Sequence, residues 1–238
     1  MNYAIIAAGE GSRLAAEGVD APKPLVKIGG ETLLERLVGI FLRCGAESIN
    51  IIVSARNEEV IAHANEIAAR SAVPVNVVVK NTPDSMHSFA EVTRGMCGKF
   101  CVTTVDTVFN TAEFERYIKA FESDDIVDGY MAVTSYVNDE KPLFVATDPS
   151  LNITAFRDVA AADTRYVSGG IYGLDEKALE VLDACLRDGT SRMRNFQRAL
   201  VAGGLRLKAY PMGKIIDIDH AADIDVAQSL LQEYNHTI

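Results

Sequence analysis

A glycine loop that follows a short apolar run constrains this chain more than any other feature. Residues 3–8 read Tyr-Ala-Ile-Ile-Ala-Ala, and Gly9 and Gly11 follow, with Ser12 and Arg13 directly behind. A short apolar run that ends at a turn signal is typical of a buried strand. Glycine lets the backbone turn sharply and lets an anion approach the backbone amides. The order therefore predicts a strand, an anion-binding loop and a helix.

Two common phosphate-binding loops are excluded by the residues behind the glycines. A P-loop needs Gly-Lys followed by Ser or Thr, whereas Gly11 is followed by Ser-Arg. A dinucleotide-binding loop needs a third glycine where this chain has Leu14. Arg13, and Lys23 in the Pro-Lys-Pro-Leu segment 22–25, still supply two cations that can hold phosphate oxygens. We therefore expect a polyphosphate site of another kind, and the alternative is a plain strand-to-helix turn.

Composition excludes several classes of protein. No apolar run approaches the roughly 18 residues of a membrane helix, and no basic region precedes the first apolar run. The formal net charge of −10 argues against a sequence-independent nucleic-acid binder, which needs a basic face. The spacing of the four cysteines fits neither a zinc site nor a redox pair, so we expect reduced thiols. We predict a cytoplasmic protein without a membrane or nucleic-acid partner.

The first half of the chain alternates predicted strands with predicted helices. Two pairs, Thr32 with Glu35 and Ser88 with Glu91, have the spacing of capping boxes and predict helix starts. The predicted strands cover residues 3–8, 49–53, 73–79 and 100–105, and the predicted helices cover 32–44, 57–70 and 88–96. This alternation predicts a parallel sheet with helices on both faces.

The second half is less regular. The predicted helices cover residues 111–121, 175–186, 193–202 and 221–233, and the predicted strands cover 130–136, 143–147, 152–156, 167–174, 205–210 and 214–218. A turn at 148–150 indicates an antiparallel hairpin added to the sheet. With no repeat or linker in 238 residues, we predict one α/β domain with a mostly parallel mixed sheet over 1–238.

The opening loop resembles a known family. Residues 7–14, Ala-Ala-Gly-x-Gly-Ser-Arg-Leu, followed by Pro-Lys-Pro-Leu, resemble the signature of sugar-phosphate nucleotidylyltransferases and the shorter cytidylyltransferases. The resemblance implies a Rossmann-like three-layer α/β/α fold, with an NTP-binding half of about 1–110 and an acceptor half of about 111–238. It also implies Mg²⁺ and two catalytic cations, Arg13 and Lys23. The implied nucleotide-binding residues are Ala7, Ala8, Gly9, Gly11, Ser12 and Ser88.

Two acidic segments are candidate metal ligands. Asp106 directly follows the apolar run 100–105, and the carboxyl end of such a strand is where α/β proteins bind ligands. Asp217 and Asp219 alternate with isoleucines and so face the same side of a strand. Residues 216–223 resemble the family's Asp-Ile-Asp segment, which implies Asp106 and Asp219 as Mg²⁺ ligands, with Asp217 as the alternative to Asp219. Without a metal, Asp106 would cap a turn and Asp219 the last helix.

The acceptor side carries a weaker resemblance. Gly169 and Gly170 lie in a segment similar to the family's acceptor-binding strand, and a glycine pair inside a strand also suggests a bulge. The family's Glu-Lys-Pro motif is missing after the preceding strand. Lys141 and Arg157 both stay open as the cation for an acceptor phosphate.

The resemblance implies transfer of an NMP from an NTP to a phosphorylated small molecule, with release of pyrophosphate. A sugar 1-phosphate is the first acceptor class, and a phosphorylated alcohol such as phosphocholine, used by a cytidylyltransferase, is the alternative. A non-catalytic nucleotide-binding protein of the same fold is the alternative from a different class. The chain is expected to act as a monomer or a homo-oligomer.

Overall fold

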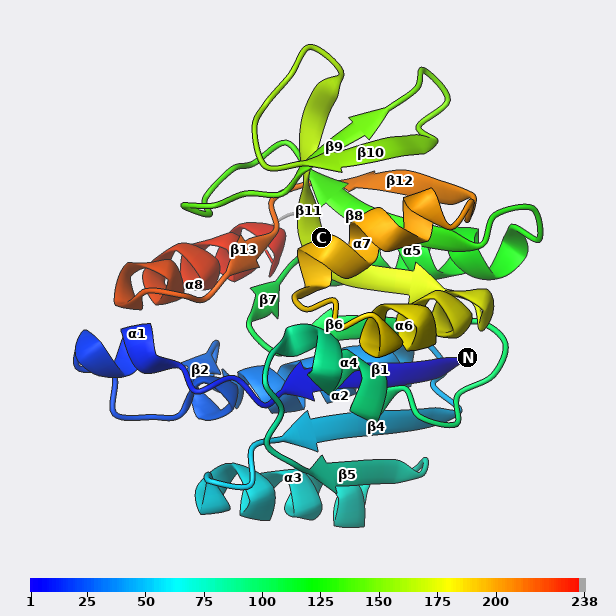
Figure 1. The fold of residues 1–238 in the computed structure, drawn as a ribbon. Helices are drawn as coiled ribbons and strands as arrows, with labels where there is room; N and C mark the ends of the chain where they lie inside the picture. Colours follow the sequence, from blue (N-terminus) through cyan, green and yellow to red (C-terminus); the bar gives the residue numbers. More distant parts are fainter. Residues whose placement is uncertain (236–238) are drawn as a thin grey trace.

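A mixed sheet of nine strands lies at the centre of the computed structural model, which describes residues 1–235 (Figure 1). The strands are β1 (Asn2–Ala7), β4 (Ser48–Val53), β5 (Val75–Val79), β6 (Phe100–Thr104), β8 (Gly129–Thr134), β9 (Phe144–Thr147), β10 (Ile153–Arg157), β11 (Thr164–Leu174) and β12 (Leu207–Met212). Their order is β10-β9-β11-β6-β1-β4-β5, and β8 pairs with both β11 and β12.

One part of the sheet is parallel, as the alternation of elements predicts. Strand β1 lies between β4 and β6 and runs parallel to both, and β5 pairs in parallel with β4. Parallel strands in one sheet place their carboxyl ends along one edge. The segments that follow β1, β4, β5 and β6 therefore meet at that edge.

The other part of the sheet is mainly antiparallel and centres on β11. This strand pairs antiparallel with β6, β8 and β9, and the predicted hairpin is the antiparallel pair β9–β10. The register between β11 and β8 shifts between Ser168 and Tyr172, which confirms the bulge expected at the glycine pair. At the far side, β12 pairs in parallel with β8.

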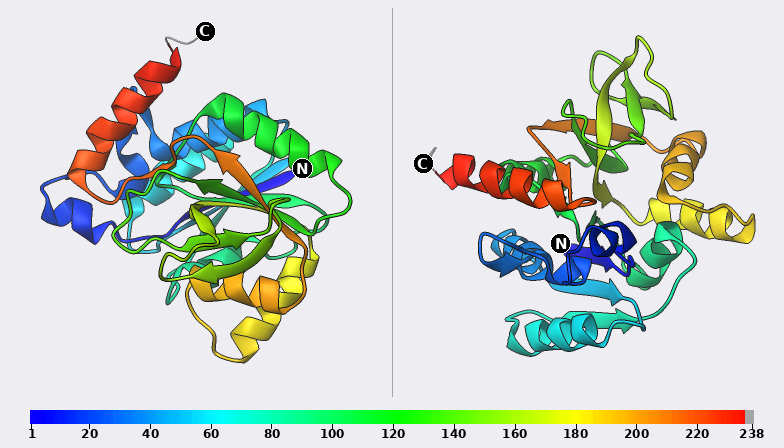
Figure 2. Two further views of the ribbon diagram at one scale, coloured as in Figure 1. Left: turned by 90° about the horizontal axis from the view of Figure 1, so that it is seen from above. Right: turned by 90° about the vertical axis from the view of Figure 1, so that its left-hand side faces the viewer.

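Helices cover both faces of the sheet, which gives the three layers seen in Figure 2. Their bounds are α1 (Ser12–Ala16), α2 (Leu33–Arg43), α3 (Glu58–Arg70), α4 (Ser85–Val92), α5 (Thr111–Ser123), α6 (Lys177–Arg187), α7 (Met193–Ala202) and α8 (Ala221–Asn235). Helices α2, α3 and α5 pack on one face, and α4, α6 and α7 pack on the other. The capping box of Thr32 and Glu35 is confirmed at the start of α2.

Two apolar clusters fill the spaces between the layers. Strand β1 contributes side chains to both clusters, because successive side chains of a strand point to opposite faces. Tyr3 and Ile5 belong to one cluster, and Ala4 and Ile6 belong to the other. All four cysteines are free. None of the helices described over residues 1–235 is both long and apolar enough to cross a membrane.

A short antiparallel ribbon lies beside the sheet edge where the parallel strands end. It consists of β7 (Thr107–Val108) and β13 (Ile216–Asp217), with Asp217 opposite Thr107. The strand expected over residues 214–218 is therefore only the two-residue strand β13. The ribbon joins the segment after β6 to the segment before α8, although they are far apart in the sequence. A second short ribbon, β2 (Lys27–Ile28) with β3 (Glu31–Thr32), precedes α2.

Candidate active site

The opening loop folds as a tight connection between β1 and α1. Gly11 has φ 60° and ψ 29°, a left-handed conformation that favours glycine. A Cβ atom on Gly11 would lie 3.2 Å from the Cβ of Lys23, so a side chain there would also crowd the segment that carries the lysine. Gly9 has open space around it. The loop thus needs glycine at Gly11 for its fold and leaves room above Gly9 for a ligand.

A cavity of about 470 Å³ opens above this loop. Its walls come from the segments after β1, β4, β5 and β6, at the sheet edge where α/β proteins bind ligands. The lining includes the predicted residues Ala8, Gly9, Gly11, Lys23, Ser88 and Asp106, and also Ser54, Arg56, Asn81, Thr82, Pro83, Asp84, Ser85 and Thr104. Ala7 is instead buried in β1, and Ser12 is the exposed first residue of α1.

The predicted capping box of Ser88 and Glu91 is wrong. Helix α4 begins at Ser85, and its cap is Asp84, whose Oδ1 accepts hydrogen bonds from the backbone N–H groups of Met86 (2.8 Å) and His87 (3.2 Å). Ser88 lies one turn inside the helix, and its hydroxyl pairs with that of Thr82 at 2.6 Å. A carboxylate cap, available earlier in the sequence, started the helix before the serine.

Four charged side chains meet beside this cavity. The Lys23 ammonium donates hydrogen bonds to Asp106 Oδ2 at 2.8 Å and to Asp219 Oδ1 at 2.7 Å. The guanidinium of Arg13 donates to the other oxygen of Asp219 at 2.7 Å. Asp106 and Asp219 therefore converge, and both approach the opening loop, as their predicted metal role requires. Asp106 lies just after β6, whereas Asp219 lies just before α8.

These contacts shift the pKa values of Lys23 and Asp219. Burial opposes the charge of Lys23, but Asp106 and Asp219 outweigh it and raise the pKa of its ammonium. Burial likewise opposes ionisation of Asp219, and the hydrogen bond from Lys23 overcomes it, so the pKa of Asp219 is lowered. Lys23 is thus held as a cation, and Asp219 is held as a carboxylate.

Asp217 lies next to these carboxylates in a different environment. It accepts a hydrogen bond from Thr107 Oγ1 at 3.1 Å across the β7–β13 ribbon. Burial, followed by the negative charge of Asp106, raises the pKa of Asp217 to about 8. Asp219 therefore shares Lys23 with Asp106, whereas Asp217 is partly buried, contacts Thr107 instead and lines the same second cavity as the other two carboxylates described below.

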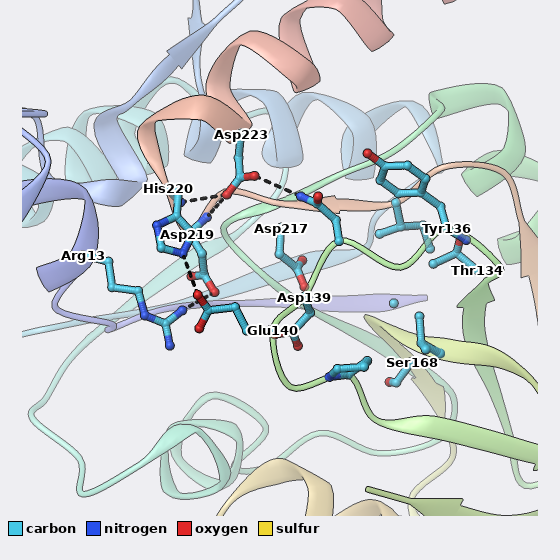
Figure 3. A pocket seen from close by; sticks show the side chains of 15 residues that line it. Arg13, Thr134, Tyr136, Asp139, Glu140, Ser168, Asp217, Asp219, His220 and Asp223 are labelled. Carbon is cyan, nitrogen blue, oxygen red and sulfur yellow. Dashed lines mark hydrogen bonds and ion pairs between the residues drawn. The ribbon is translucent and has the colours of Figure 1, made fainter. Parts of the chain in front are cut away.

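The segment around Asp219 is tied to the loop helix α1. Glu17, just after α1, accepts hydrogen bonds from His220 Nδ1 at 2.6 Å and from the Ala221 backbone N–H at 2.7 Å. Asp223 accepts from the backbone N–H groups of Asp219 (3.0 Å) and His220 (2.7 Å), so it lies in the first turn of α8 as expected. Figure 3 shows Arg13 reaching Asp219 beside His220 and Asp223. The contacts fix Asp219 relative to the loop.

A second cavity, of about 450 Å³, adjoins the first and shares Ser85, Thr104 and Asp106 with it. Asp106 lines both cavities, and Asp219 lines this one. Three basic residues, Lys141, Arg192 and Arg194, also contribute to its walls. Arg194 is fixed by Asp158 at 2.6 Å and by the carbonyl oxygen of Lys141 at 2.9 Å.

Arg192 was missed by sequence reasoning. Its φ of 71° is unusual for a residue with a side chain, and strained backbone of this kind clusters at functional sites. Among residues 1–235, its guanidinium makes no hydrogen bond or ion pair, and it lines the second cavity. Of the two cations left open by the sequence, Lys141 lines this cavity, whereas Arg157 pairs with Asp163 at 2.8 Å. The only sequence signal was a basic pair at the start of a predicted helix.

The adjacent glycines Gly169 and Gly170 of β11 have separate roles in the fold. A Cβ atom on Gly169 would lie 2.4 Å from Ile215 Cδ1, so this glycine is required by packing. Gly170 has φ 70°, and a Cβ there would lie 3.0 Å from Thr107 Oγ1. Gly170 lines the second cavity, and Gly169 lines the small cavity in Figure 3, of about 50 Å³.

The three-layer fold, with charged residues gathered at the carboxyl edge of its parallel strands, defines the class of α/β nucleotidyltransferase-like proteins. Residues 3–198 match the family model of the MobA-like NTP transferase domain. The chain belongs to this family.

Individual relatives agree with that assignment. The bifunctional IPC transferase and DIPP synthase of Rubrobacter xylanophilus is 37% identical over 121 residues, which are 49% of this chain and 26% of that protein. The chain thus aligns with about a quarter of that relative's length. The fold matches the inositol-1-phosphate CTP transferase from T. maritima with a TM-score of 0.80, 18% identity and coverage of 98% of this chain and 95% of the other. It matches a putative glucose-1-phosphate thymidylyltransferase from Bacillus anthracis with a TM-score of 0.82, 19% identity and coverage of 98% and 96%.

Proposed function

We propose that this protein transfers an NMP group from an NTP to a phosphorylated small molecule and releases pyrophosphate. One observation carries the proposal: Asp106 and Asp219 share the Lys23 ammonium where a cavity over the glycine loop adjoins a cavity whose walls include Lys141, Arg192 and Arg194. Nucleotidyl transfer needs two anionic substrates held end to end with cations and metal-binding carboxylates between them. The family assignment supports the same reaction class.

The chain's own residues account for positioning and for charge. An oxygen of the acceptor phosphate attacks the α-phosphorus of the NTP, and the bond to the β-phosphate oxygen breaks with its electron pair leaving on pyrophosphate. A phosphate nucleophile is already ionised at neutral pH, so no general base is required and catalysis reduces to positioning and charge stabilisation. We assign Arg13 and the loop amides to the triphosphate and Lys23 to the α-phosphate and leaving group. Arg192, Arg194 and Lys141 are assigned to the acceptor phosphate.

The carboxylates present fit a divalent cation. They are hard oxygen ligands, and they already converge on a positive charge, the Lys23 ammonium. Mg²⁺ is usually held by one or two carboxylates together with substrate phosphates. We therefore propose that Asp106 and Asp219 hold Mg²⁺. When bound, the ion would neutralise charge on the reacting phosphates.

A sugar 1-phosphate is the acceptor class that the family resemblance puts first. A second candidate, CTP with a phosphorylated cyclic alcohol, is favoured by a specific observation. The relative with 37% identity is named as an IPC transferase, and a neighbour of the same fold is named as an inositol-1-phosphate CTP transferase. The cavity of about 450 Å³ has room for either acceptor.

A substrate panel tests the proposal. Pyrophosphate release is measured with each of four NTPs against sugar 1-phosphates, inositol 1-phosphate and phosphocholine, with Mg²⁺ or with excess EDTA. We expect Mg²⁺-dependent release with one NTP and one acceptor class. Release that needs CTP and inositol 1-phosphate would select the second candidate. No release from any pair, together with tight NTP binding, would favour the non-catalytic alternative.

A further inference from the structure

Lys23 occupies the position between the two carboxylates that the proposed metal ion would need. Its ammonium lies 2.8 Å from an oxygen of Asp106 and 2.7 Å from an oxygen of Asp219, and its side chain is only 11% exposed. We propose that Lys23 is the internal counter-cation of the nucleotide-free protein, and that its ammonium leaves both carboxylates when the divalent cation binds together with the nucleotide. The proposal rests on the proposed function, because it assigns the same carboxylates to the metal.

The two cations exclude one another because they need the same oxygens. Mg²⁺ binds its ligands at about 2.1 Å, closer than the ammonium, and requires near-octahedral directions around itself. An ammonium still in contact with those oxygens would occupy part of this coordination shell and repel the ion. Arg13 does not block the site in this way, because it contacts only the second oxygen of Asp219 and its side chain is 55% exposed. Lys23 is therefore the group that must move.

The surrounding chain allows the side chain of Lys23 to move while its backbone stays in place. Lys23 lies between Pro22 and Pro24 and is the first residue of a short 3-10 helix (Lys23–Leu25). A hydrogen bond of 2.8 Å from the Leu25 N–H to the Pro22 carbonyl oxygen closes this turn. Prolines fix the backbone torsion φ, and Gly11 packs against the Cβ of Lys23. The flexible four-carbon stem remains free to rotate. Lys23 also lines the cavity above the glycine loop, so its ammonium can reach a triphosphate there.

The protein alone offers few ligands that could compete with Lys23 for a metal ion. Over residues 1–235, no group of three or more His, Cys, Asp or Glu side chains is arranged to hold a metal. Two carboxylates that already share an ammonium gain little from a cation until nucleotide phosphates add ligands and attract Lys23. Free protein should therefore bind the divalent cation weakly, and the cation and the nucleotide should bind together.

Mn²⁺ binding to the nucleotide-free protein tests this directly, through the electron paramagnetic resonance signal of free Mn²⁺. The variants are Lys23→Met and a matched control, Lys27→Met, since Lys27 is exposed and contacts neither carboxylate. If Lys23 occupies the site in nine molecules of ten or more, its removal raises the affinity for Mn²⁺ at least about tenfold. We expect Lys27→Met to bind like the wild type. Equal affinities in Lys23→Met and the wild type would overturn the proposal.

A thermal measurement keeps the test valid if Lys23→Met is unstable. That variant leaves the two carboxylates without the cation that they share, and only Asp219 keeps a contact to Arg13, which lowers stability. Because a ligand that binds only the native state stabilises it, Mn²⁺ should raise the Tm of Lys23→Met more than that of the wild type. A Tm of Lys23→Met that stays unchanged up to millimolar Mn²⁺ would overturn the proposal as well.

Measuring nucleotide binding in addition distinguishes a failure of this proposal from a failure of the proposed function. Calorimetry measures binding of each of the four α,β-methylene NTPs to the wild type in Mn²⁺ and in EDTA. We expect one analogue to bind at least about tenfold more tightly with Mn²⁺, since each ligand removes the cost of displacing Lys23 for the other. If no analogue binds while Lys23→Met still gains Mn²⁺ affinity, the proposed function fails and the role of Lys23 stands. If an analogue binds with Mn²⁺ while Lys23→Met gains nothing, the reverse holds.

Discussion

The two cavities that meet at Asp106 are built in different ways. The walls of the cavity over the glycine loop come mainly from the segments directly after the parallel strands β1, β4, β5 and β6. The walls of the second cavity come from the bulge of β11, the loop around Lys141, the starts of α4 and α7, the end of β6 with Asp106, and Asp217 and Asp219 at the end of β13. A parallel sheet gathers strand ends automatically, whereas the second cavity depends on contacts between distant segments. A family can therefore keep one chemistry on the first side and change acceptors on the second.

The largest expected effect concerns the carboxylates that join the two cavities. Changing Asp106 or Asp219 to Ala should lower kcat on the order of 10³-fold, because charge stabilisation at the reacting phosphates is lost. The double variant should cost little more than either single change if both serve one ion. Pyrophosphate-release kinetics measure the effect, and circular dichroism checks the fold. If the loss of kcat in the double variant equalled the product of the two single losses, Asp106 and Asp219 would act independently and would not share one ion.

The next effect tests the nucleotide side alone. Arg13→Ala and Lys23→Ala should each lower kcat/KM about 10²-fold, since each removes a cation from the phosphates. Lys27→Ala is the matched control, since Lys27 lies on the exposed side of β2. Normal turnover in both Arg13→Ala and Lys23→Ala would contradict the assignment of these residues to the phosphates of the NTP.

The stability of the sheet around β8 and β12, on which the second cavity's part of the sheet rests, offers a third test. Asp128, just before β8, accepts hydrogen bonds from the Arg206 backbone N–H at 2.8 Å and from the Lys177 ammonium at 2.5 Å. The hydrogen bonds from Arg206, followed by those from Lys177 against the cost of burial, lower the pKa of Asp128 well below its usual range. Asp128→Asn should therefore lower the free energy of unfolding by about 2 kcal/mol at pH 7.

The pH dependence follows from the direction of that pKa shift. A carboxyl with a lowered folded-state pKa stabilises the protein above its unfolded pKa of about 3.9, and this contribution is lost as the pH falls through the folded pKa. The difference between Asp128→Asn and the wild type should shrink below about pH 4 in urea unfolding. Asp125→Asn is the control, because Asp125 is almost fully exposed and should change stability by no more than about 0.5 kcal/mol. A difference that is constant with pH would rule out the charge of Asp128 as its cause.

A smaller effect compares the acceptor cations. Arg192→Ala should raise the KM for the acceptor by about 10- to 100-fold and leave the KM for the NTP unchanged, because one hydrogen bond to a charged group is worth about 1.5–3 kcal/mol. Arg157→Ala is the matched control, since Arg157 pairs with Asp163. A raised KM in Arg157→Ala, with none in Arg192→Ala, would reverse the assignment.

The contrast between the cavities also explains what the sequence could predict. The loop with Gly11 and Arg13, the strand before Asp106 and the parallel order all depend on short-range patterns, and the structure has them where expected. Arg192 could not be found, because its position depends on how α7 packs against β10 and on an unusual backbone torsion. Asp217 and Asp219 have the same alternation in the sequence, and only the contacts of Lys23 and Thr107 distinguish them.

The smallest expected effect concerns Asp84 and Ser88, beside the cavity over the glycine loop. There the spacing of Ser88 and Glu91 predicts a capping box that the structure does not have. Asp84 caps α4, so Asp84→Ala should lower the free energy of unfolding by about 1 kcal/mol. Ser88→Ala should cost about 0.5 kcal/mol, because it removes one hydrogen bond between hydroxyls and leaves the helix start intact. Urea unfolding measures both variants. If Ser88→Ala cost more than Asp84→Ala, the capping box of Ser88 and Glu91 would be the true start of the helix. The contacts of Glu91 speak against that result, since its carboxylate pairs with Lys80 at 2.8 Å and Arg94 at 2.9 Å.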